Sequence, residues 1–206
     1  NYSVNPVKGL CPMACKDNQG KEYCYAAGER GLYHRFKWNP EIRWEYADTL
    51  RAIHSIKRPS KIFMGSTMEL FGKWILPSWQ HKMFFEIPLK FPQHAFIFLT
   101  KRPQNLPREW PPNCWVGVSV TNESMLNNAF YGLNEVKAKV KFLSLEPLLH
   151  WQTHSEGWNF RLDFIDWLII GARTPYSAVT APKLEWVEEI IAAADRAGIP
   201  VFCKDN

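Results

Sequence analysis

Short runs of apolar, β-branched and aromatic residues recur along the chain, and segments with helical periodicity separate them. This alternation predicts βα units arranged around a parallel sheet. Seven strands are expected, at residues 3–7, 61–64, 95–99, 115–120, 140–145, 167–170 and 200–203. Four helices are expected, at residues 41–56, 78–89, 122–136 and 184–197. The last helix begins after Pro182 and ends before Gly198, as is usual for helix boundaries.

Some of the expected strands contain continuous apolar runs, such as 96–99 and 167–170. Such runs are typical of parallel strands that are covered on both faces. A closed eightfold barrel takes about 250 residues, whereas this chain has 206. The pattern therefore predicts an α/β fold, a partial (incomplete) parallel (β/α) barrel in a single domain over residues 1–206. An open doubly wound sheet is the alternative.

The composition indicates a folded protein and leaves its partner open. Ten Trp and thirteen Phe exclude a disordered chain. The formal net charge of +5 suits an anionic ligand or a nucleic acid, but many proteins with neither carry as much. The sequence has no apolar run long enough to cross a bilayer and no secretory signal. We therefore expect a cytoplasmic protein in which thiols stay reduced.

Three of the five cysteines, Cys11, Cys15 and Cys24, fall within fourteen residues, which predicts a metal or cluster site. A closed zinc site and an ordinary four-iron cluster each take four protein ligands. Three thiolates would leave one iron of a cubane open to a cofactor. A zinc site completed by His34 is an alternative. A disulfide is disfavoured because the cysteine count is odd and no secretory signal is present.

Polar side chains follow every expected strand, and both candidate architectures bind ligands at the carboxyl ends of their strands. Glu146 is the most informative of them, because a carboxylate that ends a buried apolar strand needs a partner. The candidate site residues at these strand ends are Ser66, Thr67, Glu69, Lys101, Arg102, Ser119, Thr121, Asn122, Glu146, Cys203 and Lys204.

The segments at these strand ends, including 68–71, 99–103 and 143–149, resemble a phage-associated family of radical S-adenosylmethionine (SAM)-like proteins, most of which have no assigned activity. The chain is more distantly similar to spore photoproduct lyase and other radical SAM barrels. Cys11, Cys15, Tyr23 and Cys24 resemble the radical SAM motif with six extra residues before the third cysteine. A longer loop can still deliver all three sulfur atoms, because loop closure costs little per added residue.

The resemblance implies a [4Fe-4S] cluster on the three cysteines and reductive cleavage of SAM to a 5′-deoxyadenosyl radical that acts on an unknown substrate, possibly nucleic acid. It also implies an external one-electron donor of the flavodoxin or ferredoxin type. Glu69, Ser66 and Thr67 would then receive the methionine ammonium of SAM. Lys101 or Arg102 would pair its carboxylate.

The remaining candidates receive roles from the same resemblance, each beside a simpler explanation. Ser119, Thr121 and Asn122 would bind the ribose, but Asn122 is also a plausible helix N-cap. Tyr23 and Tyr25 would shield the cluster and pack on adenine. Cys203 would return a hydrogen atom to a substrate radical beside Lys204, or would be a buried hydrophobe like Cys114. Lys101 and Arg102 would alternatively contact a substrate phosphate or water.

Two features depart from the family. The longer gap lies between the second and third cysteines rather than the first two, and the turn at 171–173 lacks the expected acid. Two other functions remain open. One is a non-catalytic nucleic-acid-binding module stabilised by zinc. The other is a barrel hydrolase that uses Glu69 and Glu146 as paired carboxylates.

Overall fold

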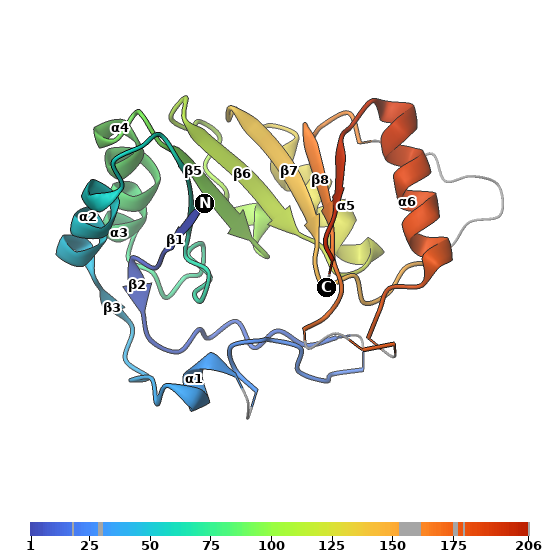
Figure 1. Cartoon of the computed structure of the whole chain (residues 1–206), viewed down its shortest axis with the longest axis horizontal. Coiled ribbons are helices and arrows are strands. Elements are labelled where there is room, and N and C mark those ends of the chain that lie inside the picture. Colours follow the sequence, from blue (N-terminus) through green and yellow to red (C-terminus); the bar gives the residue numbers. More distant parts are fainter. Residues whose placement is uncertain (18, 29–30, 153–161, 175–176, 179, 206) are drawn as a thin grey trace.

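The computed structural model of the protein describes residues 1–17, 19–28, 31–152, 162–174, 177–178 and 180–205. Its main sheet has seven parallel strands in the order β1-β4-β5-β6-β7-β8-β9. They are β1 (Tyr2–Val4), β4 (Lys61–Met64), β5 (Ala95–Thr100), β6 (Cys114–Ser119), β7 (Val140–Leu145), β8 (Trp167–Ile170) and β9 (Val201–Cys203). The order follows the chain without the reversal that a doubly wound sheet requires. The sheet is curled (Figure 1), and the predicted partial parallel barrel is confirmed.

Helices cover the outer face of the curled sheet in two groups. On one side, α2 (Tyr46–Ser55) and the consecutive segments α3 (Pro77–His81), η1 (Lys82–Glu86) and α4 (Ile87–Lys90) share a core with β1, β4 and β5. On the other side, α5 (Glu123–Leu133) and α6 (Leu184–Ala197) share a core with β6, β7 and β8. Figure 1 shows the two groups at opposite ends of the sheet. Among the described residues, no helix combines the length and apolar character needed to span a bilayer.

The first predicted strand, at residues 3–7, is divided in the structure. Residues 2–4 form β1, whereas β2 (Val7–Lys8) pairs in antiparallel fashion with β3 (Arg43–Trp44). Pro6 lies at the division and has no N–H with which to continue a ladder. Because β3 occupies residues 43–44, the helix predicted from residue 41 begins only at Tyr46.

The helix predicted at 78–89 has a wide π-turn at its centre, over Lys82–Glu86. The turn ends two residues before Pro88, which has no N–H to offer the carbonyl of Phe84 in a regular α-helix. The helix predicted at 184–197 is confirmed with both of its boundaries, and Gly198 ends it with φ of 69°. The structure also contains α1 (Leu32–Arg35) and the short 3₁₀ turn η2 (Pro103–Asn105).

Side chains along each strand alternate between the two faces of the sheet. Outward-facing side chains lie fully buried beneath the helices, among them Ile62, Phe96, Phe98, Val116 and Leu168. Inward-facing side chains are half-buried on the concave face, among them Phe63, Ile97, Leu99, Trp167 and Ile169. The continuous apolar runs in the sequence therefore place alternate side chains in two environments, a helix-covered core and the wall of a cavity.

Candidate functional site

A cavity of about 580 Å³ lies on the concave face of the sheet. Its floor is apolar, and Phe142 lies close over Gly117, where an added Cβ would come within 2.4 Å of the ring. The wall formed by the carboxyl ends of the strands is polar, and this is the end at which parallel (β/α) barrels bind their ligands. The predicted site residues that line it are Cys11, Cys15, Tyr23, Cys24, Tyr25, Ser66, Thr67, Glu69, Lys101, Ser119, Glu146 and Lys204.

The loop that carries the three cysteines, described at residues 9–17 and 19–28, is fastened to the turn after β4. The Tyr33 hydroxyl donates to the Thr67 carbonyl at 2.5 Å and accepts from the Cys11 N–H at 3.3 Å. The Tyr25 hydroxyl donates to the carbonyl of Ser66. Sequence reasoning missed Tyr33, since it belongs to neither a strand end nor the cysteine motif. These bonds explain how a loop of this length keeps a fixed position over the cavity.

Two further contacts extend the attachment of this loop and turn. Arg173, just after β8, donates through Nη2 to the Glu22 carbonyl at 2.6 Å. Asn5 accepts through Oδ1 from the Ser66 hydroxyl at 3.1 Å and from the Thr67 N–H at 3.3 Å. Asn5 was missed because the first strand was predicted to run through it. The loop therefore bridges the carboxyl ends of β4 and β8 across the cavity.

The three clustered thiols are free and line one cavity, but they are not equally close. Cys15 donates a hydrogen bond to Cys24, which lowers the pKa of Cys24 to about 6 and raises that of Cys15. Cys11 lies nearer the β4 turn, where its sulfur accepts from the Glu69 N–H at 3.3 Å, and burial raises its pKa. Within the described part of the chain, no three His, Cys, Asp or Glu side chains form a metal-binding group.

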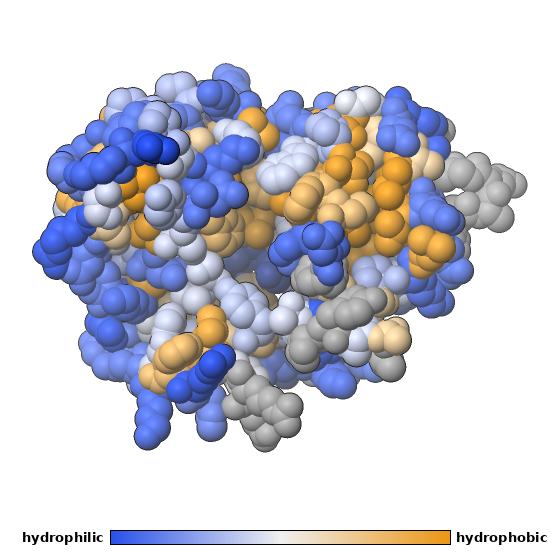
Figure 2. All heavy atoms as spheres, viewed as in Figure 1, coloured by the Kyte–Doolittle hydropathy of each residue, from blue (hydrophilic) through white to orange (hydrophobic). Residues whose placement is uncertain are grey.

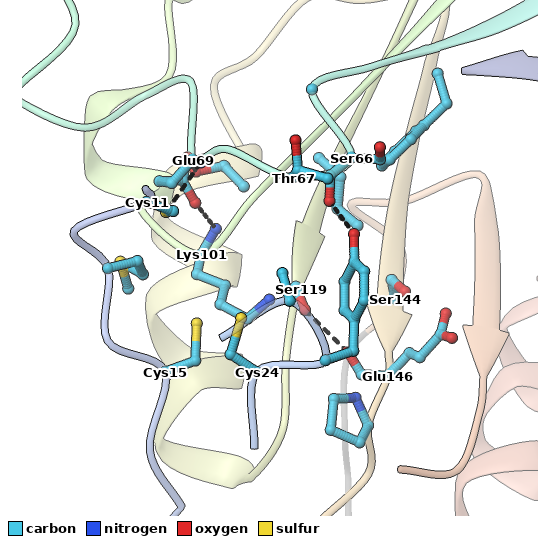
Figure 3. Close-up of a pocket in the computed structure, with 18 of the residues that line it drawn as sticks. Cys11, Cys15, Cys24, Ser66, Thr67, Glu69, Lys101, Ser119, Ser144 and Glu146 are labelled. Carbon is cyan, nitrogen blue, oxygen red and sulfur yellow. Dashed lines mark hydrogen bonds between the residues drawn. The ribbon is translucent and has the colours of Figure 1, made fainter. Parts of the chain in front are cut away.

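Lys101 extends from the end of β5 toward Cys15 and Cys24 (Figure 3). Its positive charge contributes to the low pKa of Cys24, after the hydrogen bond from Cys15 and those from the backbone. Arg102 points elsewhere, because consecutive residues of an extended chain face opposite ways. Its guanidinium carbon lies 5.2 Å from the centre of the Trp74 ring. The structure thus separates two cations that the sequence left equivalent.

Glu69 is buried and joins the β4 turn to the end of β5. Its Oε1 accepts from the Thr100 hydroxyl at 2.7 Å and from the Phe71 N–H at 3.1 Å. Its Oε2 accepts from the Lys101 N–H at 2.8 Å. Three donors hold the carboxylate in place at the cavity wall. Glu69 lies between β4 and α3 rather than at the start of a helix, so it does not act as a helix cap.

Glu146 has an ion-pair partner, as expected for a carboxylate at the end of a buried apolar strand. Its Oε1 lies 2.5 Å from Lys204 Nζ, although the two residues end β7 and β9, with β8 between them. Gly171, which follows β8, leaves the space for this contact. An added Cβ there would lie 3.1 Å from Glu146 Cγ and 3.2 Å from Lys204 Cδ. Gly171, which precedes the residues that depart from the family pattern, thus permits an ion pair across the intervening strand β8.

Of the three candidates at the end of β6, one lines the cavity and two contact the start of α5. Ser119 lines the cavity and donates to the Glu146 carbonyl at 3.2 Å. Asn122 accepts through Oδ1 from the Met125 N–H at 3.0 Å and is the N-cap of α5. The Thr121 hydroxyl donates to the Met125 sulfur at 3.2 Å. Neither Asn122 nor Thr121 is among the described residues that line the cavity.

Cys203 and His34 also lie away from the cavity. Cys203 pairs in register with Ile170 and so faces the outer side of the sheet, opposite to Lys204. His34 lies in α1 with its side chain exposed. The structure therefore does not bring Cys203 to the position of a hydrogen-atom donor, nor His34 to that of a fourth ligand.

Comparison with known proteins places the chain in a family. No curated protein matches the sequence. Two solved structures of spore photoproduct lyase match it, a tyrosine-to-phenylalanine variant with 9% identity and a TM-score of 0.48, and a cysteine-to-alanine variant with 11% identity and a TM-score of 0.44. Each alignment covers 98% of this chain and 82% of the other. Over residues 1–206 the sequence matches the family described as protein of unknown function (DUF5131), and the chain belongs to that family.

Proposed function

We propose that this protein is a radical SAM enzyme in which Cys11, Cys15 and Cys24 hold a [4Fe-4S] cluster. The observation that carries the proposal is that three free thiols from one loop line a single cavity at the carboxyl ends of a partial parallel barrel. When bound, such a cluster supplies an open iron and the electron that cleaves SAM to methionine and a 5′-deoxyadenosyl radical. A flavodoxin or ferredoxin would deliver that electron. The radical would act on a substrate such as a nucleic acid.

The donor set suits this group in chemistry and in number. Thiolates are the protein ligands of iron–sulfur clusters, and three of them leave the fourth iron free. The Lys101 ammonium beside Cys15 and Cys24 offsets the negative charge that three thiolates bring into a half-buried site. Cys11 lies apart from the other two thiols, so its side chain has to turn from the Glu69 N–H to join them.

SAM binding is supported by polar groups beside the cysteine loop. The Thr67 hydroxyl oxygen is buried at the cavity wall and has no partner among the described residues. Buried hydroxyl groups are rarely left unpaired, so an unpartnered one at a cavity suggests a ligand. Glu69 lies two residues further on, and its carboxylate matches the charge of a methionine ammonium. Ser119 at the end of β6 would meet a ribose hydroxyl.

Metal analysis of anaerobically purified protein tests the cluster. We expect about four iron and four sulfide per chain, with a brown colour and a broad absorption band in the blue. Zinc at one per chain in a colourless protein would instead favour the nucleic-acid-binding module. The measurement needs no substrate, so it is independent of the reaction that follows.

Replacing Lys101 by Met is expected to weaken SAM binding and slow 5′-deoxyadenosine formation in the absence of substrate. Loss of one charged hydrogen bond corresponds to a roughly tenfold weaker affinity. Arg102→Met is the matched control, because its guanidinium lies over Trp74 rather than in the cavity. Titration of SAM into both cluster-loaded variants measures the difference. Equal effects of the two substitutions would contradict the assignment of Lys101.

A further inference from the structure

We propose that the side entrance of the cavity, at the edge strand β9, recognises a planar ring with an N–H beside a C=O, as on the edge of a uracil or guanine base. In this arrangement the ring stacks on Phe202 while Glu146 and Lys204 pair with its edge. The inference rests on the proposed function above and names the substrate class for that reaction.

The cysteine loop lies over the carboxyl ends of the strands, so we place the route of entry at the side of the cavity. The loop is fastened to the β4 turn through Tyr25 and Tyr33 and to the end of β8 through Arg173. Among the described strands, β9 is an edge of the main sheet and pairs with β8 alone. In Figure 1 it is the red strand that ends near the C-terminus. Figure 2, in the same view, shows hydrophobic surface around this edge, on the right-hand side of a hollow.

Phe202 offers a flat apolar surface at this entrance. It pairs in register with Ile169, a cavity-lining residue, so both side chains point to the concave face. Phe202 remains 53% exposed, unlike the fully buried phenylalanines of the core. Lys204 lies two residues further along on the same face, about 7 Å away. Stacking on an aromatic ring is a common way to hold a base, and a ring on Phe202 would present its edge to Lys204 on the same face of the sheet.

The Glu146–Lys204 pair retains unused hydrogen-bonding capacity. Among the described residues, Lys204 Nζ bonds to Glu146 Oε1 alone, and Oε2 has no partner. The side chains are 29% and 38% exposed, so a ligand can reach them. A carboxylate that accepts beside an ammonium that donates complements an N–H beside a C=O. Gly171 maintains this arrangement, because a larger side chain would come between the two groups.

The other large polar groups of the cavity are bonded within the protein or, like Glu69 and Lys101, are assigned to SAM in the proposed function. Glu69 accepts from three protein donors, and the hydroxyls of Tyr25 and Tyr33 are bonded to backbone carbonyls. In the described part of the cavity, the Glu146–Lys204 pair is therefore where a substrate finds both a donor and an acceptor. An aliphatic chain would satisfy neither of them, and a phosphate would meet the Glu146 carboxylate.

Equilibrium dialysis of the anaerobically purified protein against uridine and 3-methyluridine tests this proposal. The methyl group replaces the edge N–H, so we expect saturable uridine binding and at least tenfold weaker binding of 3-methyluridine. Glu146→Gln, Lys204→Met and Phe202→Ala should each weaken uridine binding about tenfold. The matched controls are Glu109→Gln and Lys137→Met, which break an exposed ion pair of the same composition, 2.8 Å long.

Equal affinity for the two nucleosides, or no saturable binding of uridine, would overturn the proposal. Binding of glycine in place of uridine would also overturn it, since the pair would then be recognising an amino acid zwitterion. The nucleoside comparison uses the unaltered protein, so it stands even if a variant folds poorly. Iron content and SAM cleavage in the same preparation report separately on the proposed function.

Discussion

Replacing any one of Cys11, Cys15 or Cys24 by Ala is expected to abolish cluster binding. All three thiols line the cavity, and Cys15 and Cys24 are in hydrogen-bond contact. With two thiolates left, a cubane would have two irons without a protein ligand, which falls short of the usual ligand set. We expect iron in the variants to fall from about four per chain to background, as measured by metal analysis after anaerobic reconstitution.

The remaining cysteines supply the controls for this experiment. Cys114 is fully buried in the core, where burial raises its pKa to about 12, and Cys203 lies on the outer face of β9. Cys114→Ala and Cys203→Ala should therefore keep the full iron content. Loss of iron in Cys114→Ala as complete as in Cys11→Ala would contradict the three-thiolate site.

Glu69→Gln is expected to weaken SAM binding while leaving the iron content unchanged. The substitution removes the charge that would face the methionine ammonium, at a cost of about 1.5 to 3 kcal/mol, or roughly tenfold or more in affinity. Calorimetric titration of SAM into the reconstituted protein measures the loss. An unchanged dissociation constant for SAM would refute this role of Glu69.

The same substitution should also destabilise the folded protein. The carboxylate accepts from Phe71, Thr100 and Lys101 through both oxygens, whereas a Gln amide has one oxygen and an NH₂ group that would face a donor. A buried donor left without an acceptor costs about 1 to 3 kcal/mol. Urea denaturation of the cluster-free variant would show this loss, and Glu109→Gln on the exposed surface should show none.

The fold follows from the sequence because its signals are local. Apolar runs of strand length, separated by helical periods, predicted all seven strands of the main sheet. The errors fall where tertiary pairing overrides a local pattern, as where β2 and β3 pair and shorten a predicted strand and a predicted helix. The position of α6 was predictable to its last residue because Gly198 terminates it.

The site was predictable in part. Strand ends must converge in a parallel barrel, which is why most candidates line one cavity. Adjacent residues on one strand face opposite ways, so only one of the neighbouring candidates Cys203 and Lys204 lines the cavity. The partner of Glu146 depends on the space that Gly171 leaves across β8, and no local pattern encodes that space.

Formation of 5′-deoxyadenosine tests the central claim most directly. The anaerobically reconstituted protein is incubated with SAM and dithionite, and the nucleoside products are separated by chromatography. We expect 5′-deoxyadenosine to form in the unaltered protein and in Cys114→Ala, and to be absent in Cys24→Ala. A protein fully loaded with iron and sulfide that binds SAM but yields no 5′-deoxyadenosine would contradict the account.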